Sequence, residues 1–257
     1  MNRRTRIRTV SIAAAALMVA GASTAHGRQA AGRGAAPAPP TPRATAPIDL
    51  TGYWVAVITE DWRWRMVTPA KGDYASIPLN VAGKDLADTW DPARDEAAGE
   101  QCKAYGAPGL MRGPTRLRIS WLDDTTLKLE TDYGMQTRLL HFRAPRATAA
   151  PSRQGVTTAQ WVLAGGRGGA KRPGSLKSVT TRLLPGYLRK NGVPYSANTV
   201  FTEYWDVIPG PNDSQWLVVT NTVEDPANLQ VPWVTSVNFR KEPDGAKWDP
   251  TPCSARF

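Results

Sequence analysis

Few side chains in this sequence have the chemistry of a catalytic group, and three of them stand out. Glu130, His141 and Glu203 lie in segments that alternate like β-strands, so each could face an enclosed space. Two carboxylates that flank a sugar bond serve a glycosidase, and a histidine beside a carboxylate serves as a general base in a lyase or an isomerase. Cross-strand ion pairs and hydrogen bonds explain the same side chains, so catalysis and structure both stay open.

Glu203 also fits a buried ion pair. It shares a strand face with Phe201 and Trp205, whereas Tyr204 lies on the opposite face. Arg182 alternates in the same way on the preceding strand, so an inward Glu203 is expected to meet Arg182. Such a pair is costly to desolvate, which makes it informative about the interior.

Aromatic side chains suggest a binding surface. The ten tryptophans lie between Trp54 and Trp248, and they either fill a wide core or stack flat ligands. The expected partner is a small, partly apolar or aromatic molecule or a sugar. The residues expected to bind it are Trp54, Trp62, Trp64, Arg182 and Tyr204.

Residues 61–66 alternate between large apolar and basic side chains, which predicts a strand. Arg63 and Arg65 share one face of it. Inside a barrel these arginines would hold an anionic head group, and outside they would be ordinary solvated charges. The basic tip Arg189-Lys190 also has two explanations. It could gate the mouth of a barrel, or it could be an ordinary exposed hairpin turn without a function.

The sequence indicates no metal, no cofactor and no nucleic acid. His141 is the only histidine apart from His26, so a histidine-rich zinc site cannot form. The glycine-rich segment 165–169 lacks the Lys-Ser/Thr of a phosphate loop. The net charge of +10 falls to +3 without residues 1–47, which hold seven arginines and no acid. That excess is too small for a nucleic-acid face.

The first residues are typical of export. Basic residues precede the apolar run 10–20, and small residues offer a cleavage site near Ala25, so residues 1–25 are predicted to be a signal peptide. The run is too short to span a bilayer, and no membrane span is expected in the mature chain. A Sec-type signal is preferred, since only the Arg3-Arg4 pair suggests twin-arginine export. The protein is expected to be periplasmic or extracellular.

Two cysteines, Cys102 and Cys253, are present in the whole chain. In an oxidising compartment they are expected to form one disulfide, which would close a loop of about 150 residues. Neither has a CxxC partner or an adjacent histidine, so a structural role is preferred.

The remaining pattern predicts an all-β fold. Residues 26–47 are rich in Ala, Pro and Arg and are interpreted as a flexible linker, followed by a single domain over residues 48–257. About nine or ten strands with short turns form an antiparallel meander, which is expected to close into a barrel, with a β-sandwich as the alternative. One short helical insertion begins at Asp91-Pro92. Asn191-Gly192 predicts a type I′ hairpin turn.

Short motifs resemble those of known families. Gly52-Tyr53-Trp54 and Thr131-Asp132-Tyr133 resemble two motifs of lipocalins and related calycins, which implies a calycin-like barrel. In that family a late cation packs over the motif tryptophan, and the resemblance points to Arg240. The second lipocalin motif stands near the end of those chains, whereas about half of this chain follows it.

A broader resemblance is to an uncharacterised family of secreted β-rich proteins of soil bacteria, which has no established activity. It covers most of the mature length and transfers no catalytic residue. The stretches that carry it are 50–54, 185–196, 224–226 and Cys253.

These observations favour a secreted or periplasmic protein that binds a small molecule in an aromatic-lined pocket. The alternative is a lyase, isomerase or glycosidase that uses carboxylates and His141 in the barrel cavity. A third class is an interaction module with exposed tryptophan platforms. Ligand identity and oligomeric state are left open.

Overall fold

The computed structural model describes residues 38–145, 149–163 and 174–256. The predicted signal peptide and residues 26–37 of the predicted linker lie outside these ranges, as does the glycine-rich segment 165–169. The last part of the predicted linker packs on the folded domain, because the Trp161 indole donates to the carbonyl oxygen of Pro42 at 2.8 Å. Residues 39–256 accordingly belong to one compact unit. No helix in the described ranges is long and apolar enough to cross a membrane.

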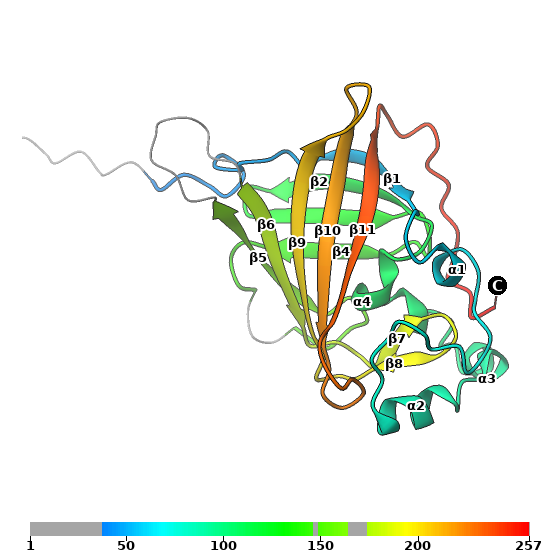
Figure 1. Cartoon of the computed structure of the whole chain (residues 1–257). Helices are drawn as coiled ribbons and strands as arrows, with labels where there is room; N and C mark the ends of the chain where they lie inside the picture. Colours follow the sequence, from blue (N-terminus) through cyan, green and yellow to red (C-terminus); the bar gives the residue numbers. More distant parts are fainter. Residues whose placement is uncertain (1–37, 146–148, 164–173, 257) are drawn as a thin grey trace, which may run out of the picture. The chain divides into compact units, whose positions relative to one another are not determined.

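Nine strands form a closed barrel in the order β1-β11-β10-β9-β6-β5-β4-β3-β2 (Figure 1). The predicted calycin-like all-β barrel is therefore confirmed. Its strands are β1 (Gly52–Val57), β2 (Arg116–Asp123), β3 (Thr126–Thr131), β4 (Thr137–His141), β5 (Val156–Leu163), β6 (Gly174–Thr181), β9 (Val200–Pro209), β10 (Gln215–Glu224) and β11 (Trp233–Glu242).

The barrel departs from a simple meander at two places. Strands β4 and β5 are parallel and share only two residue pairs, Leu140 with Thr157 and His141 with Thr158. Strand β6 pairs with β9, and the chain between them forms a separate hairpin of β7 (Gly186–Arg189) and β8 (Val193–Tyr195). All other neighbours in the barrel are antiparallel.

The hairpin turn differs from the predicted type I′ turn. A type I′ turn needs positive φ at both central residues. Here Gly192 has φ +84°, whereas Asn191 does not have a positive φ. Arg189 pairs with Val193, so the loop holds three residues with the glycine in the left-handed region.

Short helices replace the single predicted helical insertion. They lie with the β7–β8 hairpin at the lower right of the barrel in Figure 1. Asp91 caps α3 as predicted, since its carboxylate accepts the backbone N–H groups of Ala93 and Arg94. The helices are α1 (Trp62–Arg65), α2 (Val81–Ala87), α3 (Pro92–Ala97), the 3₁₀ turn η1 (Lys103–Tyr105) and α4 (Ala107–Leu110).

The predicted strand over residues 61–66 is wrong. Strand β1 ends at Val57, and Asp61, with φ +53°, starts the single helical turn α1. Four alternating residues fit both structures, because one helical turn is too short to show its period. As a result Arg65 is buried and Trp62 is 65% exposed.

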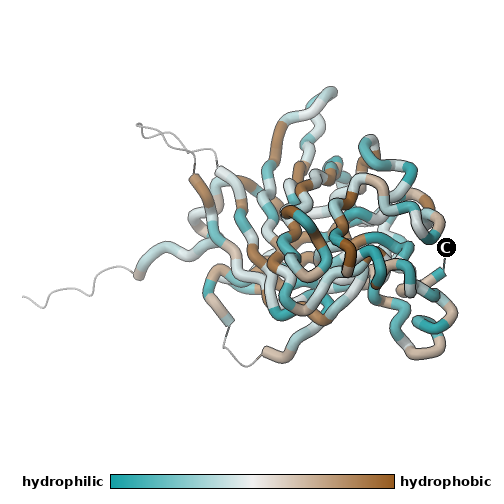
Figure 2. The backbone as a smooth tube through the Cα atoms, turned by 60° about the horizontal axis from the view of Figure 1, so that its bottom comes forward, coloured by the Kyte–Doolittle hydropathy of each residue, from teal (hydrophilic) through white to brown (hydrophobic). Residues whose placement is uncertain are grey.

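Side chains fill the barrel. Most inward-facing residues of the barrel strands are buried, and a few, such as Trp121 and Trp161, are partly buried against the core. The strands alternate between hydrophobic and hydrophilic residues (Figure 2). Met111, just after α4, also belongs to this core. A second hydrophobic core includes Leu188 and Tyr195 of the β7–β8 hairpin and Trp233 of β11.

The predicted disulfide between Cys102 and Cys253 is formed. It ties the segment after α3 to the C-terminal segment, and the two cysteines are 151 positions apart in the sequence.

Candidate functional site

The three candidate catalytic residues do not converge. Glu203 on β9 points into the barrel and is fully buried, whereas Glu130 on β3 and His141 on β4 lie on the outer face. Glu130 forms an ion pair with Arg118, 2.7 Å away, which lowers the pKa of its carboxyl. The sheet itself separates Glu203 from the other two, so they cannot act on one substrate.

Glu203 is buried beside an arginine, as predicted, but the arginine is Arg138. Arg138 Nη1 and Nη2 donate to the two carboxylate oxygens of Glu203 at 2.9 and 2.5 Å, and both side chains are 0% exposed. Ser178 donates to the same carboxylate at 2.9 Å and accepts from the Trp205 indole at 3.0 Å. Arg182, the predicted partner, lies beyond the end of β6 with φ +57° and is exposed.

The five predicted ligand-binding residues lie in different places. Trp54 fills the barrel core, and Trp62 is exposed on α1. Tyr204 lies on the outer face of β9, where the amine of Lys177 is 5.5 Å from the centre of its ring. Arg182 is exposed, as described above. Of the five, Trp64 alone lines the pocket described below.

The cation over Trp54 is Lys241, not Arg240. The Lys241 amine lies 4.4 Å from the centre of the indole and donates to the carbonyl oxygen of Thr51. Arg240 is exposed and is the cross-strand partner of Val55. A shift of one residue along a strand moves the side chain to the other face of the sheet.

A pocket with cationic walls lies where α1, α4 and the β7–β8 hairpin meet the end of β3. It encloses about 30 Å³, room for two or three water molecules or a small charged head group, and it is partly open to solvent. We call it the cationic pocket. It is lined by Trp64, Arg65, Ala104, Gly109, Arg112, Gly113, Tyr133, Leu188, Arg189 and Lys190.

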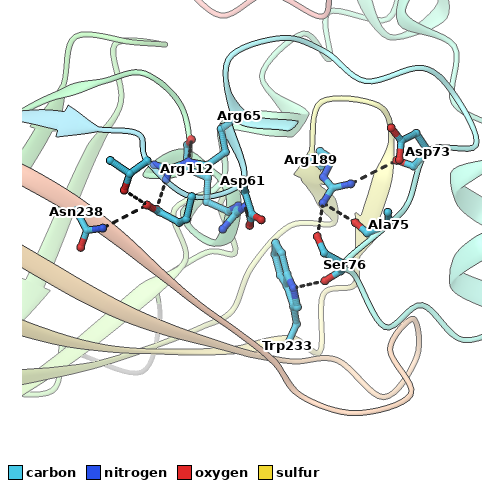
Figure 3. Close-up of polar contacts among 11 residues, drawn as sticks. Asp61, Arg65, Asp73, Ala75, Ser76, Arg112, Arg189, Trp233 and Asn238 are labelled. Atoms are coloured by element: carbon cyan, nitrogen blue, oxygen red, sulfur yellow. Dashed lines mark hydrogen bonds and ion pairs between the residues drawn. The ribbon is translucent and has the colours of Figure 1, made fainter. Parts of the chain in front are cut away.

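Three buried guanidinium groups give the cationic pocket its charge. Arg65, Arg112 and Arg189 are 6%, 6% and 5% exposed. Figure 3 shows Arg65 and Arg112 together, with Arg189 beside Trp233. Arg65 Nε donates to the carbonyl oxygen of Arg112 at 2.8 Å, which fixes the pair relative to each other.

Two of these arginines have carboxylate partners. Arg65 pairs with Glu60, and Arg112 Nη2 donates to Asp61 at 2.8 Å. Each still has one buried nitrogen, Nη2 of Arg65 and Nη1 of Arg112, with no hydrogen-bond partner among the described residues. A buried guanidinium N–H without an acceptor is costly, so both groups favour an incoming anion.

Arg189 hydrogen-bonds to neutral oxygens. Its nitrogens donate to the backbone carbonyls of Asp73 and Ala75 and to the hydroxyl of Ser76, at 3.0 to 3.3 Å. Within the described part of the chain no carboxylate lies within ion-pair distance of it. Burial, followed by the charge of Arg112, lowers the pKa of Arg189 to about 10. The cationic pocket therefore has an excess of positive charge at neutral pH.

Aromatic rings hold these cations in place. Arg189 lies 5.2 Å from the centre of the Trp64 ring, and Arg112 lies 4.8 Å from that of Trp233. The Trp233 indole donates to the carbonyl oxygen of Ser76 at 2.9 Å, so it is fixed in turn. A ligand in this pocket would meet charge and aromatic surface together.

Sequence reasoning found only parts of this pocket. Arg65 was predicted, with Arg63, as a group that could hold an anionic head group inside a barrel, and the tip Arg189-Lys190 as a possible gate at a mouth. Nothing in the sequence placed them in one site. Arg112 and Tyr133 come from the turns after α4 and β3, where no periodicity is available. For Tyr133 and the hairpin, the resemblances were the available sequence signal, because Tyr133 belongs to the 131–133 motif and the hairpin to the stretch 185–196. Neither stretch includes Arg112.

Comparison with models of known protein families, with curated proteins and with solved structures finds no match to this chain. Among the described residues no group of three or more His, Cys, Asp or Glu side chains could hold a metal ion. The candidate site therefore rests on its own geometry.

Proposed function

We propose that this protein binds a small organic anion in the cationic pocket. A carboxylate or similar oxyanion would accept hydrogen bonds from Arg65 and Arg112, and the rest of the ligand would lie against Trp64 and Tyr133. The expected class of protein, a binder of small partly aromatic molecules, is kept. The proposed site moves from the barrel interior to the short helices and the β7–β8 hairpin beside the barrel, which we together call the cap.

The observation that carries the proposal is the pair of buried, unpartnered guanidinium nitrogens, Nη2 of Arg65 and Nη1 of Arg112. They belong to side chains that line one cavity and are fixed by other contacts. A preorganised fork of donors is what carboxylate recognition uses. Arg189, which also lines the pocket, adds positive charge.

We further propose that binding takes place in the periplasm or outside the cell. The predicted signal peptide and the disulfide between Cys102 and Cys253 support this location.

Isothermal titration calorimetry with a panel of small carboxylates and with inorganic phosphate tests the proposal. Arg112→Gln is expected to weaken the tightest ligand by about 10- to 100-fold, the effect of losing one charge-assisted hydrogen bond. Arg118→Gln is the matched control, because Arg118 is also ion-paired but lies on the outer face of the barrel.

Equal weakening by both variants would mean that the anions bind through general charge rather than in the pocket. Absence of binding across the whole panel would refute the proposed function.

A further inference from the structure

Lys190 is the one primary amine among the residues that line the cationic pocket. It occupies the tip of the β7–β8 hairpin, and both neighbours anchor that tip. Arg189 donates to the carbonyl oxygen of Ala75 at 3.0 Å, and Asn191 donates to that of Asp73 at 2.9 Å. The amine is therefore carried by a turn that is held in place.

The surroundings of this amine are aromatic. Its Nζ lies 4.4 Å from the ring centre of Tyr133 and 5.3 Å from that of Tyr105. Burial lowers the pKa of Lys190 to about 6, so most of the amine is neutral at neutral pH. A neutral lysine amine is a nucleophile toward carbonyl carbon, whereas an ammonium is not.

Anion-binding groups share the small enclosed space with this nucleophile. Arg65 and Arg112 also line this cavity, and each has one buried guanidinium nitrogen without a hydrogen-bond partner among the described residues. In a cavity of about 30 Å³, a carboxylate held by these arginines has its neighbouring carbon close to the other walls, which include Lys190. A carbonyl next to a carboxylate is the ligand chemistry that uses both features.

We propose that Lys190 forms a Schiff base with a small keto acid whose carboxylate is bound by Arg65 and Arg112. The inference rests on the anion-binding function proposed above and names the class of the ligand.

The step is balanced without any oxidant or reductant. The nitrogen lone pair attacks the carbonyl carbon, the C=O π electrons move to oxygen, and a proton passes from nitrogen to that oxygen to give a carbinolamine. Loss of water then breaks the C–O bond and forms C=N. Tyr133 has the only hydroxyl among the lining residues, which makes it the group to exchange protons with the departing oxygen.

Reductive trapping tests the inference on the folded chain, with pyruvate as the probe. Pyruvate and cyanoborohydride are expected to give one secondary amine, located at Lys190 by peptide mass mapping. Lys190→Arg keeps a long nitrogen-bearing side chain at the position but removes the primary amine, and it is expected to abolish the adduct. Arg112→Gln leaves the nucleophile in place and is expected to reduce the trapping rate at low pyruvate by at least about tenfold.

Lactate separates this inference from the proposed function, because it has the carboxylate but no carbonyl. Calorimetric binding of both acids without an adduct at Lys190 would overturn the Schiff base and leave the anion pocket standing. Binding of neither acid, together with no trapping, would overturn both. Equal labelling of exposed lysines such as Lys84 and of Lys190 would also overturn the inference.

Discussion

At the scale of single residues, the two most informative features are the internal pair of Arg138 with Glu203 and the amine of Lys190. Arg138 and Glu203 form a buried ion pair inside the barrel, in which both Nη groups of Arg138 donate to the carboxylate. Lys190 is a half-buried residue at the tip of the β7–β8 hairpin. The first is an ion pair in the barrel core, and the second lines the cationic pocket.

Breaking the internal pair is expected to destabilise the barrel strongly. Glu203→Gln leaves the Arg138 charge without its counter-charge in a site that is 0% exposed, and we expect a loss of about 3–5 kcal/mol in the free energy of unfolding. Urea denaturation monitored by tryptophan fluorescence measures this. Glu130→Gln removes an ion-paired carboxylate from the outer face and is expected to cost at most about 1 kcal/mol. Similar losses for the two variants would contradict a special role for the internal pair.

Lys190 is expected to make stability depend on pH in a defined direction. Its pKa is about 6 in the folded protein and about 10.4 in an unfolded chain, so between these values the unfolded state binds more protons. Stability contributed by this group therefore increases with pH from about 6 to about 10 and is constant below 6. Lys190→Met is expected to flatten the pH profile of the urea midpoint over this window. An unchanged slope would show that the amine is charged in the folded state.

At the scale of elements, the β7–β8 hairpin matters most, because its tip supplies Arg189 and Lys190 to the cationic pocket. The tip depends on Gly192, whose φ of +84° is unfavourable for other residues. A Cβ at that position would lie 2.2 Å from the Cβ of Trp90, so space is lacking as well.

Gly192→Ala is therefore expected to displace the tip and to weaken anion binding by at least about tenfold, with a loss of about 1–3 kcal/mol in stability from backbone strain. Calorimetry and urea denaturation measure the two effects. Gly72→Ala is the control, because Gly72 also has a positive φ of +89° but no heavy atom lies within 4 Å of a Cβ placed there. If Gly192→Ala bound the anion with the affinity of the wild type, the conformation of the hairpin tip would not determine anion binding.

At the scale of the whole molecule, the strands could be predicted because each buries one face. Alternation predicted about nine or ten strands, and the structure has nine in the barrel and two in the β7–β8 hairpin within the described residues. The number of strands and the closure of the barrel followed from the lack of helices and the need to cover edges. The parallel contact of β4 with β5 could not be predicted, because the connection between them has no repeating pattern.

The cationic pocket was beyond prediction for a related reason. Its residues come from turns and one-turn helices, and their convergence depends on how the cap packs on the barrel rather than on any local period. The pairing of Glu203 with Arg138 similarly depends on strand order, since β4 and β9 are not adjacent.

The disulfide acts on the whole chain, because it joins residues 151 positions apart. Cys102→Ser with Cys253→Ser is expected to lower the free energy of unfolding by up to about 5 kcal/mol, the chain-entropy value for a loop of this size. Urea denaturation of the double variant against the oxidised wild type measures the loss. A loss below about 1 kcal/mol would mean that the C-terminal segment stays docked without the bond.

The position of β1 between β2 and β11 also determines when the barrel can close during synthesis. Translation delivers β1 first among the strands and β11 last. Until β11 emerges, one edge of β1 has no partner, and so has one edge of β10. An incomplete chain thus exposes open sheet edges, which favour aggregation and the binding of chaperones. The barrel can close only after β11 has been made.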